Sequence, residues 1–440
     1  LKDTVYYSLA TAGSKVGSFL LIPLINSVLS VESFGEYDLF LISAAFITLI
    51  IGLGIDSGIA IIISENIKKE KNIKFLFTYS LTISLGLLYC LAFIGFLFNM
   101  YLKFIELNVY MLLILYVNFT YITYFVFNFI RWIGNTRLAA LISFYSSILS
   151  ILIGVLFLYL INKSIESLFL GMVIGSLFGS IMSLFISRKY ISFKIIKKGE
   201  LILKDLLKLS IPFVPTYLSN YFSAFCDRFI ILFLIGDIYL IGLYALFYRI
   251  SQIGSLAANL ITKGFLPVMY NNYKTSEGKI LIKKMFNYFN LSLIPILILI
   301  YFFSDFFIKI LGGKNYSEFL EYSYLLPSMF MSTLITSGMA MNGFGFAIRR
   351  KTQYIAIISI SGLVLNFIIS LIFVPLYGFS IVVTSTLISS IFIACTYSII
   401  SERLFKFNYN IKTMLFIYFT LFIVSQTLIF LNLESISKIN

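Results

Sequence analysis

The stretch SNYFSAFCDRFIILFLIGD (residues 219–237) has the composition of a membrane-buried helix, except that Asp227 and Arg228 lie in its middle. A charge at the centre of a bilayer costs roughly 2.5–3.5 kcal/mol even on the mildest insertion scale. Charged residues in such a place therefore face a polar interior, pair with one another or take part in transport. The rest of the chain indicates which of these interpretations applies.

The chain as a whole is too apolar for a soluble protein, with 60% hydrophobic and 12% charged residues. Apolar runs long enough to span a bilayer recur from one end to the other, so we expect an all-α integral membrane protein. The opening run has no small-residue cleavage site after its apolar core and is interpreted as the first span. The predicted spans are 4–29, 37–63, 75–98, 107–129, 138–161, 166–187, 211–235, 239–268, 285–303, 318–347, 353–374, 378–400 and 413–431.

The reactive side chains argue against metal-dependent and histidine-dependent chemistry. Cys90, Cys226 and Cys395 all fall inside predicted spans, so neither a disulfide framework nor a zinc site is expected. The chain has no histidine, which removes the commonest general base and the commonest proton switch. We expect no enzymatic activity and no cofactor, with H⁺ or Na⁺ as the candidate ion for coupled transport.

The net charge of +14 is explained by membrane topology. If the amino terminus is cytoplasmic and the loops alternate, most of the 33 lysines and arginines fall in inside loops, with a dense group in 188–208. This is the positive-inside pattern, and it requires no nucleic-acid partner. Binding of 188–208 to lipid headgroups is an alternative role for the same charges.

The sequence also repeats itself. FGEYDLF (34–40) resembles IGLYALF (241–247) at an offset of 207 residues, and TRLAALIS (136–143) resembles TQYIAIIS (352–359) at an offset of 216. Six spans per repeat is an even number, so both halves would enter the membrane in the same sense and be related by a pseudo-two-fold axis along its normal. The predicted divisions are an N-terminal six-helix lobe 1–187, a basic cytoplasmic linker 188–209, a C-terminal six-helix lobe 210–402 and an additional transmembrane helix 411–432.

Six charges lie within predicted spans, and five of them belong to a polar helix face, while the sixth, Arg228, adjoins Asp227. Because polar stripes avoid lipid, the four helices that carry them are predicted to surround a wet, net cationic cavity between the two lobes. The faces are Thr4, Ser8, Thr11, Lys15 and Ser18; Ala45, Thr48, Gly52 and Asp56; Thr216, Asn220, Ser223 and Asp227; and Arg249, Gln252, Asn259 and Lys263. The candidate substrate-binding residues are Lys15, Arg228, Arg249, Lys263, Asn220, Gln252 and Asn259, and the candidates for ion coupling or gating are Asp56 and Asp227.

Several of these residues have a structural alternative. Asp227 and Arg228 could form an ion pair, Lys263 could extend to the inner headgroups, and Asp56, among the glycines of IGLGIDSGIA, could fix helix packing. Lys15 and Arg249 have no nearby partner of opposite charge in the sequence, so function is the favoured interpretation for them. Stacking on sugars and core packing are the two interpretations of four neighbouring tyrosines, Tyr217, Tyr221, Tyr244 and Tyr248.

Three segments resemble the polysaccharide transporter family, in the same order along the chain: SKVGSFLLIPLINSVLSVESFGEYDLF (14–40), GLGIDSGIA (52–60) and IPFVPTYLSNYFSAFCDRFIILFLIGDIYLIGLYALFYRI (211–250). These are Wzx-type O-antigen and polysaccharide repeat-unit flippases, in the MOP exporter superfamily that also holds MATE exporters and the lipid II flippase. The resemblance implies two six-helix bundles in a V shape and alternating access. Helices matching 4–29, 37–63, 211–235 and 239–268 line the family's central cavity, which is often cationic.

The resemblance also implies the substrate and partners. The substrate would be an undecaprenyl-pyrophosphate-linked glycan, moved from the cytoplasmic to the periplasmic leaflet of the bacterial inner membrane. Membrane lipids surround such a protein, and the polysaccharide polymerase machinery is a further candidate partner. Family members commonly have 12 or 14 spans, so the single additional helix at 411–432 departs from the family pattern.

Two alternatives remain open at this point. A MATE-like cation-coupled exporter would take a cationic or amphipathic guest and would carry a buried acid in its first helix, where this chain has Lys15. A membrane-embedded polysaccharide polymerase or ligase would need a large outside loop with catalytic residues. The longest predicted outside loop, 304–317, is short, and a transport assay beside a polymerisation assay would separate the two classes.

Overall fold

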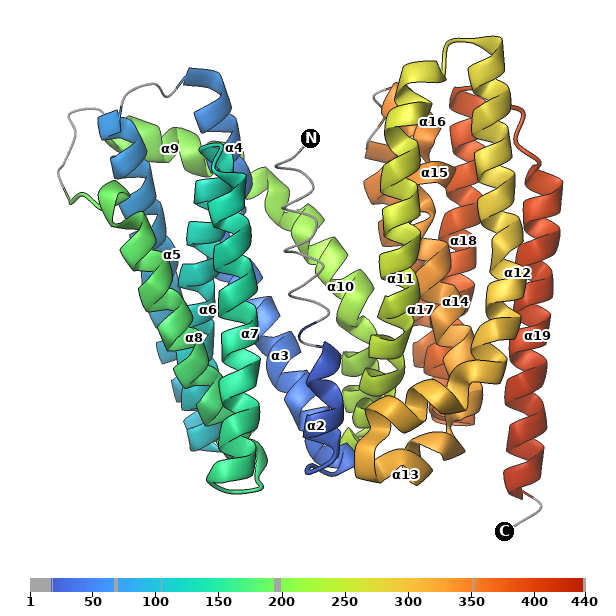
Figure 1. Ribbon diagram of the computed structural model, residues 1–440, viewed down its shortest axis with the longest axis horizontal. Helices are drawn as coiled ribbons and strands as arrows, with labels where there is room; N and C mark the ends of the chain where they lie inside the picture. Colours follow the sequence, from blue (N-terminus) through green and yellow to red (C-terminus); the bar gives the residue numbers. More distant parts are fainter. Residues whose placement is uncertain are drawn as a thin grey trace. The chain divides into compact units, whose positions relative to one another are not determined.

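The computed structural model describes residues 17, 19–66, 70–103, 105–193, 199–349, 351 and 353–437, with side chains except those of 64–66, 70, 71, 260, 263, 267 and 433–437. The described residues form helices and connecting turns, without a strand (Figure 1). The α-helices are α2 (Ile22–Asn26), α3 (Val31–Gly52), α4 (Ile55–Asn66), α5 (Glu70–Leu102), α6 (Leu107–Trp132), α7 (Thr136–Leu160), α8 (Ile165–Ser187), α9 (Gly199–Ser210), α10 (Val214–Ile230), α11 (Ile238–Asn272), α12 (Ser276–Gly312), α13 (Tyr316–Glu321), α14 (Leu326–Ser337), α15 (Met339–Asn342), α16 (Phe344–Ile348), α17 (Gln353–Tyr377), α18 (Ser380–Leu404) and α19 (Ile411–Ser437).

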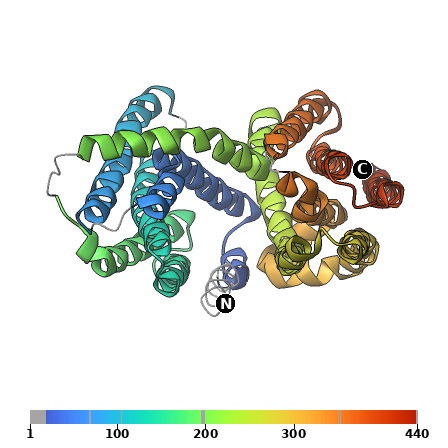
Figure 2. The same ribbon diagram turned by 90° about the horizontal axis from the view of Figure 1, so that it is seen from above.

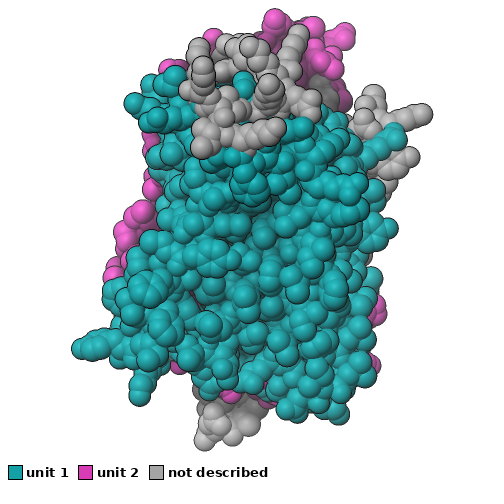
Figure 3. Space-filling view, turned by 90° about the vertical axis from the view of Figure 1, so that its left-hand side faces the viewer, with its two compact units in different colours: residues 1–30, 36–221 teal, residues 31–35, 222–440 magenta. Residues whose placement is uncertain are grey.

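The chain divides into two compact units, coloured separately in Figure 3. Unit 1 comprises residues 1–30 and 36–221, and unit 2 comprises residues 31–35 and 222–440. In unit 1, α6, α7 and α8 pack on one another, and α9, which lies within the predicted linker, packs on α4 and α5. In unit 2, α14 packs on α11, α12 and α18, and α17 packs on α18. Helix α19 packs on α12 and α18 at the edge of this unit (Figure 2).

The protein is a multi-pass membrane protein, because 11 helices of the described part are long and apolar enough to cross a bilayer. They correspond one for one to predicted spans. The predicted span 4–29 lies mostly outside the described residues. The predicted span 318–347 is not one helix: it begins in α13 and a short 3-10 turn and continues as α14, α15 and α16, with Gly338 and Gly343 at the breaks between these three. Glycine is a poor helix former, and two of them here interrupt an otherwise apolar run.

The internal repeat has a structural counterpart. Helices α3 and α11 begin at Val31 and Ile238, which are 207 residues apart, the same offset as between FGEYDLF and IGLYALF. The packing pairs also recur, since α6–α8 and α7–α8 in unit 1 correspond to α14–α18 and α17–α18 in unit 2. Two bundles of the same construction are therefore present, as the repeat predicted. The V-shaped arrangement of the bundles stays a prediction.

The repeated motif itself forms a close helix contact within unit 2. A Cβ on Gly35 would clash with the carbonyl oxygen of Ile238, and a Cβ on its repeat equivalent Gly242 would clash with that of Val31. Only glycine permits backbones to approach this closely. The aromatic positions that the two motifs share are buried as well: Tyr37, Phe40, Tyr244 and Phe247.

Candidate functional site

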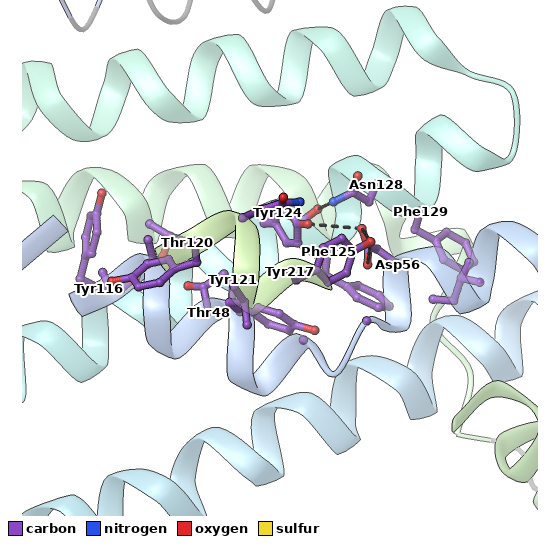
Figure 4. A pocket seen from close by; sticks show the side chains of 18 of the residues that line it. Thr48, Asp56, Tyr116, Thr120, Tyr121, Tyr124, Phe125, Asn128, Phe129 and Tyr217 are labelled. Atoms are coloured by element: carbon purple, nitrogen blue, oxygen red, sulfur yellow. Dashed lines mark hydrogen bonds between the residues drawn. The ribbon is translucent and has the colours of Figure 1, made fainter. Parts of the chain in front are cut away.

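Unit 1 contains a cavity of about 520 Å³ between α3, α4, α6 and the first part of α10. Aromatic residues are the largest group in its walls, and Asp56 is the one charged residue among the described residues that line it. In Figure 4, Asp56 lies close to Tyr124 and Tyr217, while Tyr116 lies toward the opposite end. The remaining lining residues are Leu41, Ala44, Ala45, Thr48, Leu49, Gly52, Gly54, Ile59, Thr120, Tyr121, Phe125, Asn128, Phe129, Trp132, Asn220 and Tyr221.

A break between α3 and α4 positions Asp56 at this cavity. Leu53 and Gly54 have positive φ angles of 46° and 69°, so the helix stops and restarts with Asp56 in the first turn of α4. A carboxylate in a first helical turn is favoured by the helix dipole. A Cβ on Gly54 or Gly58 would clash with Ser210, so these glycines serve close packing against the end of α9, while Asp56 faces the cavity.

Two tyrosines donate hydrogen bonds to the Asp56 carboxylate. The Tyr124 hydroxyl lies 3.4 Å from Oδ2, and the Tyr217 hydroxyl lies 3.3 Å from Oδ1 and 3.5 Å from Oδ2. The Ser57 hydroxyl lies 2.5 Å from the hydroxyl of Tyr217. These bonds join α4, α6 and α10 through one half-buried acid, and their lengths of 3.3–3.5 Å leave the carboxylate able to accept from a guest.

A second cavity of about 400 Å³ in unit 1 has Tyr116, Thr120 and Tyr124 in common with the first. Its other described lining residues are mainly hydroxyl-bearing: Thr123, Ser143, Ser146, Ser147, Ser150 and Ser176, with Phe127 and Ile151. Close packing of α7 on α8 fixes this wall, because a Cβ on Gly175 or Gly179 would come within 3.0 Å of Ser150 or Ser146. The spacing of four residues between Gly171, Gly175 and Gly179 presents one small-residue face to α7.

Asp227 lies in unit 2, buried at 4% exposure, and is not among the described residues that line the two cavities of unit 1. Its carboxylate accepts hydrogen bonds from the Tyr244 hydroxyl, from Asn366 Nδ2 at 3.0 Å and from Thr386 Oγ1 at 3.1 Å. The cluster continues to two serines, since Ser385 and Ser370 donate to Asn366 Oδ1 at 2.8 and 3.2 Å. Four helices, α10, α11, α17 and α18, thus meet around one buried carboxylate and several side-chain oxygens.

The two arginines of the candidate set also lie in unit 2. Arg228 is buried at 1% exposure, with its guanidinium 4.0 Å from the ring centroid of Tyr248 and 4.8 Å from that of Tyr244. Arg249 is half-buried, with its guanidinium 5.0 Å from the ring of Phe34. Aromatic faces stabilise both cations. Tyr244 and Tyr248 therefore pack on a guanidinium.

The remaining candidates are distributed as follows. Lys15 lies outside the described residues, and the side chain of Lys263 is not among those described. Asn220 is exposed on α10 and lines the first cavity of unit 1. Gln252 is half-buried in α11, and Asn259 is exposed there, donating to the carbonyl oxygen of Ser255 at 2.8 Å.

The sequence analysis did not find the hydroxyl walls of unit 1 or the partners of Asp227. The signal in the sequence is a row of uncharged polar residues at steps of four, Tyr116, Thr120, Tyr124 and Asn128. Asn366 and Ser370 are likewise four residues apart in an apolar helix. Polar side chains without charge are common in membrane helices, and only the fold shows which of them meet.

Comparisons with known proteins agree with this architecture. A multidrug resistance MATE family transporter of the MOP superfamily, inward-facing, aligns with a TM-score of 0.66 at 16% identity, over 91% of this chain and 95% of the other. The lipid II flippase MurJ aligns with a TM-score of 0.59 at 17% identity, over 98% and 100%. A MOP superfamily transporter from Pyrococcus furiosus aligns with a TM-score of 0.58 at 15% identity, over 92% and 94%. The fold is therefore that of MOP-superfamily transporters.

Sequence comparison gives a more specific result. No curated protein sequence matches this chain. A protein-family model described as polysaccharide biosynthesis protein matches residues 1–272. Because this match covers more than half of the sequence, the chain belongs to the polysaccharide biosynthesis protein family.

Proposed function

We propose that the protein is a flippase that moves undecaprenyl-pyrophosphate-linked oligosaccharides from the cytoplasmic to the periplasmic leaflet of the bacterial inner membrane. The observation that carries this proposal is the combination of a polysaccharide biosynthesis sequence with the fold of a membrane transporter. The MATE transporter and the lipid II flippase, whose fold this chain shares, support a role in moving a substrate across the bilayer. A Wzx-type role unites the two findings.

The charged residues support an amphiphilic substrate with an anionic headgroup. Arg249 offers a planar guanidinium that can bind two phosphate oxygens at once, and Lys15 is the second cation assigned to this task. Arg228, packed on two tyrosines, is the candidate that receives the headgroup after Arg249 or holds Asp227 in place. Alternating access between two bundles then exposes the headgroup to one side of the membrane at a time, in the orientation with a cytoplasmic amino terminus.

Ion coupling belongs to the same proposal. Asp227, Asn366, Ser370, Ser385 and Thr386 gather side-chain oxygens in one buried cluster, which is the donor set that a hard cation such as Na⁺ prefers. Protonation of Asp227 is the alternative use of the same carboxylate, and Asp56 is the second candidate. Asp227→Asn should abolish any dependence of transport on Na⁺ or pH, whereas Asp205→Asn, on an exposed residue of α9, should leave it unchanged.

The test of the function is a leaflet assay. Purified protein is reconstituted with a fluorescent undecaprenyl-pyrophosphate-linked saccharide, and a membrane-impermeant quencher measures how much label has changed leaflet. Protein-dependent exchange supports a flippase. Absence of exchange with folded, inserted protein would refute it, and formation of longer glycans instead would indicate the polymerase or ligase class.

One observation favours a second candidate function. A carboxylate in an aromatic-walled cavity also suits an amphipathic cation, the guest of a MATE-like exporter. The same vesicles loaded with tetraphenylphosphonium or ethidium separate the two candidates. Export of these cations without movement of the lipid-linked saccharide would favour the exporter.

A further inference from the structure

We propose that the two adjoining cavities of unit 1 form a saccharide site selective for neutral and amino sugars over acidic ones. The proposal rests on the proposed flippase function and names the part of the substrate that this unit binds. The two cavities have volumes of about 520 and 400 Å³, and each volume is within the range of sites that enclose small ligands. Three residues, Tyr116, Thr120 and Tyr124, line both cavities, so the two adjoin along one face of α6.

The hydroxyl wall is rich in hydrogen-bond acceptors. Thr120, Thr123, Ser146 and Ser176 donate their hydrogens to carbonyl oxygens of their own helices, at 2.7, 3.2, 2.6 and 2.8 Å. Ser150 donates to the carbonyl oxygen of Met172 at 3.1 Å. A hydroxyl has one hydrogen to donate and two lone pairs to accept with, so the hydroxyls of this wall that reach the cavity keep a lone pair for a guest. A guest with many O–H donors complements such a wall, and a sugar is that kind of guest.

The aromatic wall complements the apolar face of a sugar ring. Tyr121, Phe125, Phe129 and Trp132 line the larger cavity, and their negative ring faces attract the weakly positive C–H groups of a pyranose. An aromatic wall and an acceptor wall that share three residues present the two kinds of surface that a sugar itself carries.

The charge of the cavity sets which sugars fit. Asp56 lines it, and neither lysine nor arginine is among its described lining residues. Arg131 lies beside the cavity, with its guanidinium 4.5 Å from the ring of Trp132. A uronate carboxylate would face Asp56 at close range, whereas an ammonium group or a hydroxyl would bind to it. The cavities of unit 1 therefore suit the glycan, whereas the pyrophosphate is assigned to the cations Arg249 and Lys15.

Trp132 makes the proposal directly measurable, because it is the only tryptophan of the chain and lines the larger cavity. Purified protein is titrated with the methyl glycosides of N-acetylglucosamine, glucosamine and glucuronic acid while tryptophan fluorescence is recorded. We expect saturable changes with the first two and at least tenfold weaker binding of the glucuronide. Asp56→Asn should weaken glucosamine binding at least tenfold, change N-acetylglucosamine binding less than threefold, and strengthen glucuronide binding.

A matched pair of serine variants tests the hydroxyl wall. Ser146→Ala removes an acceptor from the smaller cavity, while Ser361→Ala removes an exposed hydroxyl of α17 that bonds in the same way, to the carbonyl oxygen four residues earlier at 2.8 Å. The first variant should weaken N-acetylglucosamine binding threefold or more, and the second should not. Thermal melting checks that every variant is folded.

Three results would overturn the saccharide site. The first is that no glycoside changes the fluorescence of Trp132. The second is equal binding of the glucuronide and the neutral glycoside, and the third is a fluorescence change with tetraphenylphosphonium alone. Flipping of the lipid-linked saccharide without any glycoside response would leave the flippase intact and remove this site from it. Glycoside binding without flipping would retain the site and refute the transport function.

Discussion

At the scale of single residues, the charged groups of the two units suit different parts of one amphiphilic substrate. Asp56 in unit 1 faces an aromatic and hydroxyl-lined cavity, which suits neutral or cationic groups. Arg249 in unit 2 carries a fixed positive charge in a half-buried position over Phe34. A guanidinium is weakly hydrated and planar, so it binds phosphate at a lower cost of desolvation than an ammonium group does.

Replacing Arg249 tests this assignment. Charge-assisted hydrogen bonds are worth about 1.5–3 kcal/mol, so Arg249→Ala should lower flipping of the pyrophosphate-linked saccharide by about tenfold to a hundredfold. Arg249→Lys should retain part of the activity, because the charge survives and the fork is lost. Flipping is measured in vesicles containing equal amounts of folded protein.

The matched control is Arg188→Ala, which removes an exposed arginine from the segment after α8 and should leave transport unchanged. Parental activity in Arg249→Ala would assign that guanidinium to folding alone. Equal losses in both arginine variants would indicate a general effect of net charge.

The sequence predicted some of these residues and not others. Asp56, Asp227, Arg228 and Arg249 were predicted because a charge in an apolar run is conspicuous. Thr386 and the serines of α7 were not predicted, because a hydroxyl in a membrane helix usually bonds to its own backbone. Which hydroxyls also line a cavity depends on helix rotation and crossing, which a single sequence does not contain.

At the scale of elements, the close contact between α3 and α11 explains why the repeat is visible in the sequence. Gly35 and Gly242 occupy equivalent positions, and each permits the other helix's backbone to approach. The similarity at this motif therefore has a packing reason, since both copies need glycine at the contact.

A substitution at this contact has a clear expected result. Gly242→Ala would place a Cβ against the carbonyl oxygen of Val31, and overpacking of this kind costs about 1–3 kcal/mol. The melting temperature of the purified protein should therefore fall. Gly264→Ala on the same helix adds a Cβ in open space and should be neutral or stabilising, by up to about 1 kcal/mol. Equal melting temperatures of the two variants would show that α3 and α11 can move apart at this contact without loss of stability.

Helix breaks were the least predictable elements. The glycines of the run 37–63 were interpreted as helix packing, whereas Leu53 between two of them adopts a positive φ and divides α3 from α4. The run 318–347 similarly conceals the divisions at Gly338 and Gly343. Hydropathy identifies that a segment lies in the membrane, whereas the local backbone is decided by packing against neighbouring helices.

At the scale of the whole molecule, the predicted topology can be tested directly. Reporter fusions after residues 66, 200, 275 and 405 should report the cytoplasm, and fusions after 33 and 312 should report the periplasm, because the basic loops remain on the inner side. Paired phosphatase and fluorescent-protein reporters read the two sides independently. A periplasmic signal at 200 would invert every helix and with it the direction assigned to the cavity.

The fold class followed from the sequence because apolar runs determine the number of spans and the repeat determines their grouping. The sequence does not determine in the same way how the two bundles are arranged around a transport path. In the proposed function, binding of the substrate and the ion would shift the populations of different arrangements of the same bundles. The driving force of the proposed transport cycle is therefore tested by measuring transport, because the packing within each bundle does not reveal it.

The electrical potential of the membrane supplies the last prediction. The cytoplasm of a bacterium is negative, and moving a pyrophosphate headgroup with about two negative charges outward is favoured by roughly 4–5 kcal/mol per 100 mV. We expect a potential set by a potassium gradient and valinomycin, negative on the cytoplasmic face, to accelerate flipping in vesicles with no Na⁺ or proton gradient. Reversing the potential should slow flipping, and the Asp227→Asn variant should keep this response, since the substrate itself carries the charge. Flipping that ignores the potential and requires an ion gradient would mean that an obligatory counter-ion, bound at Asp227 or Asp56, drives the cycle.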